Sequence, residues 1–292
     1  MITLFITTLN QAITFLPLAF ALYISFCILR AIDLTLDGSF VLGAALFARL
    51  IELNVSPPLA AICALLGGAT IGFSISLIQR GQKIDPLLAG VLATFILLSG
   101  NLLIMGRPNI SLLSRVTLVS SAFQHSQSSG WMLTAFLSSI FCLLAYLILI
   151  TRCGLILRAF GDNQNLLQRR GQPIEVYRLC GFALTNSLAA ISGCLTAQTI
   201  GYADVGMGYG MTLTALGTVI LGKQILSVIL SYKRFNVGIE FISCLIGVIF
   251  YFYAVNGLLK LEINPLYLKI LLGTALIIFL RLVRTTKTQE AG

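Results

Sequence analysis

Ten polar residues stand within or beside long apolar stretches of this chain, and they are the residues most able to do chemistry there. They are Asp33, Thr35, Asp37, Ser39, Asn101, Asn186, Asp204, Tyr209, Thr212 and Lys223. A charged group at the centre of a bilayer costs roughly 2.5–3.5 kcal/mol on insertion scales. Polar groups retained at such a cost are candidates for binding a polar solute or an ion along a route through the membrane.

These residues also have structural interpretations. Asp33 and Asp37 are four residues apart and share a face if their segment is helical, but both could instead cap a helix at an interface. Lys223 could extend its ammonium group to an interface. The glycines between Asp204 and Thr212 are spaced for close helix packing, although they could also let backbone carbonyls face a cavity.

The elements that position these residues must lie in a membrane. Of the 292 residues, 58% are hydrophobic and 10% are charged, whereas soluble domains carry about 25% charged residues. So few charges cannot cover a soluble globule, which excludes soluble enzymes, disulfide-stapled secreted domains and nucleic-acid binders. We therefore expect an all-α polytopic membrane protein, embedded in a lipid bilayer as a single domain over residues 1–292.

The number of membrane spans follows from the length of the apolar stretches, because a helix needs about 20 residues to cross. Nine stretches are candidates: 6–29, 36–51, 58–78, 86–105, 131–150, 181–200, 207–230, 237–255 and 264–280. The second and seventh are short or broken by glycine and could be re-entrant half-helices that line a cavity. The total could therefore be eight to ten. Stretches 33–73 and 203–251 share an order of features that predicts an internal duplication.

The distribution of basic residues predicts the orientation. With the N-terminus outside, the cytoplasmic side would hold thirteen Lys and Arg residues and the external side five, which agrees with the positive-inside rule. The external five are Arg49, Arg107, Arg115, Lys260 and Lys269. This asymmetry explains the net charge of +9 without a polyanionic partner such as nucleic acid.

The residue types needed for catalysis or metal binding are scarce. The seven cysteines form no CxxC pair, and the single histidine, His125, stands among serines. The segment GTVILGKQ, residues 217–224, is one residue short of a phosphate-binding loop and has Gln224 where a hydroxyl would hold Mg²⁺. We therefore predict no catalytic residue, no metal site and no nucleotide site on this chain.

Two polar segments are long enough to meet a partner. Residues 106–130 form the longest external loop, which we expect to be solvated, with a short interfacial helix, or to dock an external partner. Residues 151–173 form the longest cytoplasmic loop. Here Gly161, Asp162 and Asn163 make a turn and a helix start, so we expect a short helix parallel to the membrane that could dock into a groove on a soluble partner.

The cytoplasmic loop carries a family resemblance. Its pattern G-x-x-x-R-A-x-G-D-N-x-x-x-x-x-x-x-G resembles the coupling loop of bacterial ABC importer permeases, in the subgroup that includes branched-chain amino acid and ribose permeases. More narrowly, it resembles uncharacterised relatives that are paired with a lipoprotein binding protein. The segments AIDLTLDGSFVLGAAL (31–46) and GYGMTLTALGTVILG (208–222) resemble other elements of that family. The residues that match the loop, with the leucine pair inside it, are Gly154, Arg158, Ala159, Gly161, Asp162, Asn163, Leu166, Leu167 and Gly171.

The resemblance implies a transmembrane permease in the bacterial inner membrane that imports a small polar solute, such as an amino acid. The expected assembly has two permease subunits, here a homodimer, with cytoplasmic ATPase subunits that bind ATP and Mg²⁺ and an external substrate-binding lipoprotein. The permease itself is then not an enzyme. The alternative is a self-contained secondary transporter coupled to Na⁺ or H⁺, for which Asp33, Asp37 and Asp204 could supply an ion site.

Overall fold

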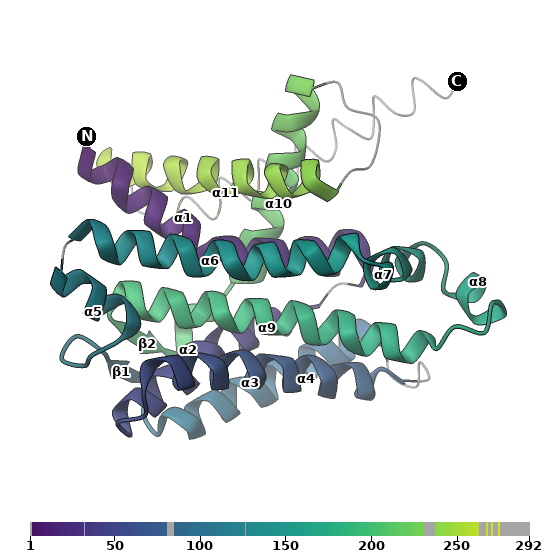
Figure 1. Ribbon diagram of the computed structural model, residues 1–292, viewed down its shortest axis with the longest axis horizontal. Coiled ribbons are helices and arrows are strands. Elements are labelled where there is room, and N and C mark those ends of the chain that lie inside the picture. Colours follow the sequence, from purple (N-terminus) through teal and green to yellow (C-terminus); the bar gives the residue numbers. More distant parts are fainter. Residues whose placement is uncertain are drawn as a thin grey trace.

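The computed structural model describes residues 2–31, 33–80, 85–125, 127–230 and 237–262, together with Tyr267, Ile270 and Thr274. Helices dominate this part of the chain (Figure 1). In order the elements are α1 (Ile2–Tyr23), the π-helix η1 (Ile24–Ile28), α2 (Leu36–Glu52), α3 (Pro57–Ile78), α4 (Pro86–Met105), β1 (Asn109–Ser111), α5 (Leu118–His125), α6 (Gln127–Ile150), α7 (Arg152–Asp162), α8 (Gln164–Arg169), α9 (Ile174–Ile200), β2 (Tyr202–Asp204), the 3₁₀-helix η3 (Val205–Gly208), α10 (Met211–Leu230) and α11 (Val237–Lys260).

Most of the long helices lie along a common axis, so the molecule has two distinct ends. In Figure 1, α3, α4, α6, α9 and α11 run along the long axis, while α10 is steeply inclined to them. One end carries α5 and the antiparallel pair β1 and β2, in which Ile110 lies opposite Ala203. The other end carries α7 and α8. The expected short helix in the 106–130 loop is present as α5, and the small sheet beside it has no counterpart in our sequence-based expectations.

Seven helical segments in the described part of the chain are long and apolar enough to cross a membrane. The expected number of nine is therefore not confirmed. The second stretch is α2, whose 17 residues extend about 25 Å, short of the roughly 30 Å hydrocarbon core. The ninth stretch, 264–280, lies almost wholly outside the described residues. The seventh stretch is broken as expected, since the 3₁₀-helix η3 and a turn precede α10.

The outward faces of these helices are apolar because lipid, not water, is their solvent. On α3, α4 and α6 large apolar side chains alternate with buried small ones, and many are exposed. The most exposed include Leu59, Ile62, Phe95, Ile96, Leu103, Met132 and Phe136. Such surfaces would be unusual on a water-soluble monomer and fit a protein surrounded by acyl chains.

Glycines let helix backbones touch in two places. A Cβ added at Gly43 of α2 would lie 1.9 Å from the carbonyl oxygen of Ala190 on α9, and one at Gly72 of α3 would lie 2.1 Å from that of Phe182. Helices α2, α3 and α9 therefore form one closely packed group. A Cβ at Gly222 of α10 would lie 1.9 Å from the carbonyl oxygen of Ser243 on α11, so α10 and α11 form a second group.

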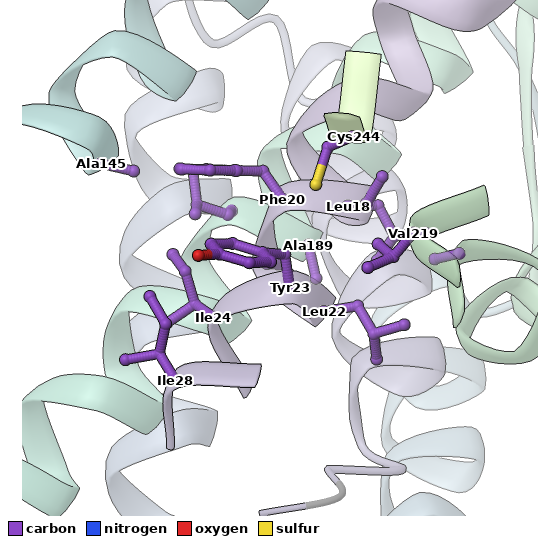
Figure 2. Close-up of a cluster of buried hydrophobic side chains, with 14 of the residues drawn as sticks. Leu18, Phe20, Leu22, Tyr23, Ile24, Ile28, Ala145, Ala189, Val219 and Cys244 are labelled. Atoms are coloured by element: carbon purple, nitrogen blue, oxygen red, sulfur yellow. The ribbon is translucent and has the colours of Figure 1, made fainter. Parts of the chain in front are cut away.

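Helix α1 and its π-helical end connect these groups. Figure 2 shows Tyr23 surrounded by neighbours from several helices, including Ala189 of α9, Val219 of α10 and Cys244 of α11. Tyr23 is fully buried, and its ring stacks on that of Phe20 at a centroid distance of 5.7 Å. The π-helix then ends in a turn at Arg30, which has a φ of 51°.

The glycine contact between α2 and α9 can be tested with a matched pair of substitutions. Gly43→Ala should lower the thermal unfolding midpoint of the purified protein, because overpacking costs typically 1–3 kcal/mol and the obstructing atom belongs to the backbone. Gly100→Ala on α4 should raise it slightly, since a Cβ there meets nothing within 4 Å. Circular dichroism in detergent measures both. Equal shifts in the two variants would contradict the packing described here.

Candidate functional site

Eight of the ten predicted route residues lie in or beside two clusters, and the first is a buried hydrogen-bond network. Asn186 of α9 donates from Nδ2 to Asp33 Oδ2 at 2.8 Å and accepts at Oδ1 from Ser39 Oγ at 2.6 Å. The Thr35 hydroxyl donates to Asp33 Oδ1 and lies 3.2 Å from Asn186 Oδ1. Thr35 also donates its backbone N–H to Asp33 Oδ1 at 2.9 Å. All four side chains are buried. The polar groups of this cluster form hydrogen bonds with one another. These bonds tie the segment between η1 and α2 to the middle of α9.

The second cluster forms where α10 begins. Asp37, in the first turn of α2, accepts from the backbone N–H of Gly210 at 3.1 Å, and its other carboxylate oxygen accepts from both the N–H and the hydroxyl of Thr212. The first N–H groups of a helix have no partner within that helix. Asp37 therefore caps α10. The capping interpretation is correct for this residue, but the capped helix is 173 positions further along the chain.

A cavity of about 350 Å³ opens beside this cap, between α2, α4 and the start of α10. Asp37, Asn101, Tyr209 and Thr212, four of the ten predicted route residues, line it. Most of its wall is apolar, and the remaining lining residues are Leu34, Gly38, Val41, Thr94, Phe95, Leu98, Val205, Gly208, Gly210 and Leu213. Known small-molecule sites have this character, with apolar walls and few polar groups in about 300–1,000 Å³.

Asn101 is a polar residue of this wall with an unused hydrogen-bond acceptor. Its Nδ2 donates to the carbonyl oxygen of Gly38 at 3.0 Å. Its Oδ1 is buried and has no hydrogen-bond partner among the described residues. A buried acceptor without a partner costs roughly 1–3 kcal/mol. A donor on a bound solute could recover that loss once the amide turns towards the cavity.

The remaining predicted route residues lie elsewhere. Asp204 sits in the small sheet, where it accepts from the N–H of Gly206 at 2.7 Å and caps η3. Lys223 lies inside α10, and its ammonium group pairs at 2.9 Å with Glu240 in the first turn of α11. The three carboxylates offered for an ion site, Asp33, Asp37 and Asp204, thus have separate partners. Among the described residues, no group of three or more His, Cys, Asp or Glu side chains could hold a metal ion.

The segment that resembles a coupling loop contains two helices rather than one. Helix α7 follows α6 after Thr151, and Arg158 of α7 reaches back to donate to the carbonyl oxygen of Leu149 at 2.6 Å. Gly154 packs against the same residue, where a Cβ would lie 2.1 Å from that oxygen. Gly154 and Arg158 therefore set the angle between α6 and α7, with Ala159 partly buried against the core.

The end of α7 touches the π-helix. A Cβ at Gly161 would lie 1.9 Å from the carbonyl oxygen of Ile28, the last residue of η1. Asp162 pairs with Arg30 at 2.6 Å, although both side chains are largely exposed. Gly161 and Asp162 are thus the last residues of α7, whereas the sequence pattern predicted them as part of a turn.

Asn163 is the residue that starts α8. Its backbone is extended, and its Oδ1 accepts from the N–H of Leu166 at 3.1 Å. Gly171, with a φ of 70°, follows the end of the helix in the left-handed conformation that glycine favours. Leu167 is buried, while Leu166 is 46% exposed. The expected short helix is confirmed, and it presents an apolar side chain outward.

Some site residues escaped sequence reasoning. Thr94, Leu34 and Phe95 reach the cavity, but nothing separates them from other residues of apolar stretches. Glu240, the partner of Lys223, lies in the first turn of α11, where an acidic residue is common and does not by itself suggest a site. A count of charges inside apolar runs could have paired it with Lys223.

Known proteins resemble this chain in sequence over most of its length. Residues 4–280 match the family described as the branched-chain amino acid transport system permease component. An uncharacterised protein of Rickettsia prowazekii is 43% identical over 96% of this chain and 97% of its own length. The tyrosine transport system permease protein of Clostridioides difficile is 30% identical over 94% of this chain and 90% of its own length. No solved structure matches significantly.

A more distant relative is the autoinducer 2 import system permease protein of Salmonella typhimurium, 26% identical over 66% of this chain and 55% of its own length. The chain therefore belongs to the branched-chain amino acid transport system permease family. It is the transmembrane permease subunit of an ABC importer and a multi-pass protein of the bacterial inner membrane. Members of this family are transport subunits and not themselves enzymes.

The cap of α8 can be tested by hydrogen exchange. Asn163→Ala should speed exchange of the amides of residues 164–170, because loss of an N-cap costs about 0.5–2 kcal/mol. Asn163→Asp should retain wild-type protection. Asp162→Ala is the control and should change exchange little, since an exposed ion pair contributes roughly 0–1 kcal/mol. The assignment fails if the Asp162 variant is the one that frees α8.

Proposed function

We propose that this chain forms part of the translocation path of a binding-protein-dependent importer, and that the cavity beside Asn101 and Thr212 belongs to that path. The observation that supports this most directly is the position of the cavity between the two glycine-packed groups. Its α2 wall belongs to the group of α2, α3 and α9, its α10 wall belongs to the group of α10 and α11, and α4 and η3 complete the lining. A site between two rigid groups can open and close by small rotations of one group against the other.

The proposed solute is a small polar metabolite, with an amino acid as the first candidate. A largely apolar wall with an unpaired amide oxygen suits a molecule that has both an apolar part and a hydrogen-bond donor. The tyrosine transport permease of Clostridioides difficile, similar over nearly its whole length, makes aromatic amino acids the natural first test. The volume of about 350 Å³ is sufficient for a ligand of that class.

The proposed partners follow the ABC importer assembly. A cytoplasmic ATPase, which binds ATP and Mg²⁺ and hydrolyses the nucleotide, would contact α7 and α8. An external substrate-binding lipoprotein would contact the end that carries α5, β1 and β2. A second copy of this chain would complete the transmembrane part as a homodimer. On this chain, residues 217–224 are helical within α10, and Lys223 is paired with Glu240, so ATP is expected only on the partner.

The ATPase contact can be tested at the exposed leucine. Leu166→Asp should reduce co-purification of the ATPase subunit at least tenfold, because it places a charge on the apolar surface that α8 presents. Leu113→Asp, an equally severe change at an 83% exposed position near the other end, is the control and should leave recovery of the ATPase subunit unchanged. Undiminished ATPase recovery and uptake in the Leu166 variant would make α8 only a lipid-facing segment.

The solute path can be tested at Asn101. Asn101→Leu should raise the KM for uptake of a radiolabelled amino acid, with tyrosine tested first, by roughly 2- to 10-fold, the worth of one neutral hydrogen bond. Asn256→Leu is the matched control, since that buried amide donates to Gln11 Oε1 on α1, away from the cavity. Proteoliposomes that contain the whole complex provide the assay. An unchanged KM in the Asn101 variant would remove the cavity from the path.

A further inference from the structure

A charged cluster joins α10, α11 and the end of α1. The Lys223 ammonium nitrogen lies 2.9 Å from Glu240 Oε2 and 3.2 Å from the sulfur of Cys27, and 5.2 Å from the centre of the Tyr23 ring. Tyr23 ends α1 and Cys27 belongs to η1. One side chain of α10 thus contacts α11 and the junction of α1 with η1, which lies about 200 positions earlier in the sequence.

The ion pair is not needed to hold α10 against α11. The contacts at Gly222 and Gly247 already bring those two backbones together, because a Cβ at Gly247 would lie 2.0 Å from the carbonyl oxygen of Thr218. Charges within an apolar region carry a desolvation cost that their mutual attraction does not always recover. The distinctive contribution of Lys223 is therefore its contact with Tyr23 and Cys27, which links the α10–α11 group to η1.

The same π-helix receives the end of α7. Gly161 places the α7 backbone against the carbonyl oxygen of Ile28, and Asp162 pairs with Arg30 just beyond η1. π-helical segments are rare and frequently occur at functional sites. A displacement of α7 would press directly on η1, because no flexible side chain lies between the two backbones at Gly161.

Helix α10 extends from this cluster to the cavity. Thr212 lines the cavity and is held by Asp37, and Lys223 lies three helical turns later on the same helix, about 16 Å along its axis. A continuous series of contacts therefore runs from α7 through η1 and Lys223 to the wall of the cavity.

We propose that Lys223 is a positioning residue that transmits movement of α7 to the start of α10, and so couples the ATPase to the cavity. The inference rests on the proposed function above, in which an ATPase binds α7 and α8. Glu240 balances the charge that this contact requires within the membrane.

The test compares two variants in the complete complex with the ATPase and the binding protein. K223M/E240Q removes both charges together, so neither is left unpaired, and keeps side chains of similar length. K223R keeps the positive charge and its attraction to the Tyr23 ring. In proteoliposomes, K223M/E240Q should assemble and retain basal ATP hydrolysis. In K223M/E240Q, the stimulation of ATP hydrolysis by the binding protein and the solute uptake per ATP hydrolysed should both fall at least tenfold. K223R should keep both quantities near the wild-type level.

A distance measurement separates transmission from a general loss of stability. Spin labels at Phe95 and Leu213, both exposed and both lining the cavity, should change separation when the wild-type complex is trapped with ATP. In K223M/E240Q that change should disappear. If the double variant transports and shifts its labels like the wild type, the cluster only stabilises the fold and the inference is overturned. If the wild-type chain itself recruits no ATPase, the proposed function fails instead.

Discussion

The carboxylate of Asp37 meets the strongest physical constraint on this fold. Helix α10 begins beside the start of α2, and its first N–H groups need a partner outside the helix. Both oxygens of Asp37 are committed to that helix start. These bonds tie the start of α10, the inclined helix in Figure 1, to the first turn of α2. The cavity exists because the helix that forms one of its walls starts there.

Two kinds of contact complement this cap. Glycines join α2, α3 and α9 into one group and α10 with α11 into another, by removing the side chains that would separate their backbones. Between the groups, polar contacts join Asp37 to the start of α10 and Lys223 to η1, beside the apolar core around Tyr23 of α1. Movement between the groups would have to break these hydrogen bonds and also slide the apolar side chains packed around Tyr23 past one another.

The loop motif also has a physical explanation, residue by residue. Gly154 and Arg158 join α7 to the end of α6, Gly161 lets α7 touch η1, Asn163 starts α8, and Gly171 follows its end. These roles keep α7 and α8 in a defined position relative to the helices. A stiff element at that end of the molecule can transmit force, whereas an unstructured loop of equal length would absorb it.

The sequence by itself determined the class of protein. Its few charges and long apolar stretches required a membrane, and the excess of Lys and Arg on alternate loops predicted an orientation. Helix-forming signals with short range were also readable, as at Asn163 and Gly171, because capping depends on neighbouring residues. The loop pattern and its resemblance identified the permease family, which the match over residues 4–280 confirms.

Only the tertiary structure decided which polar residues share a site. Asp33 and Asp37 are four positions apart, yet one bonds to Asn186 of α9 and the other to Thr212 at the start of α10. Helical spacing predicts a shared face only where the chain is helical, and α2 begins after Asp33, at Leu36. The partners of Lys223 could not be predicted from the sequence either. Hydrogen bonds and ion pairs between distant segments depend on how helices cross, and the pattern along one chain does not contain that geometry.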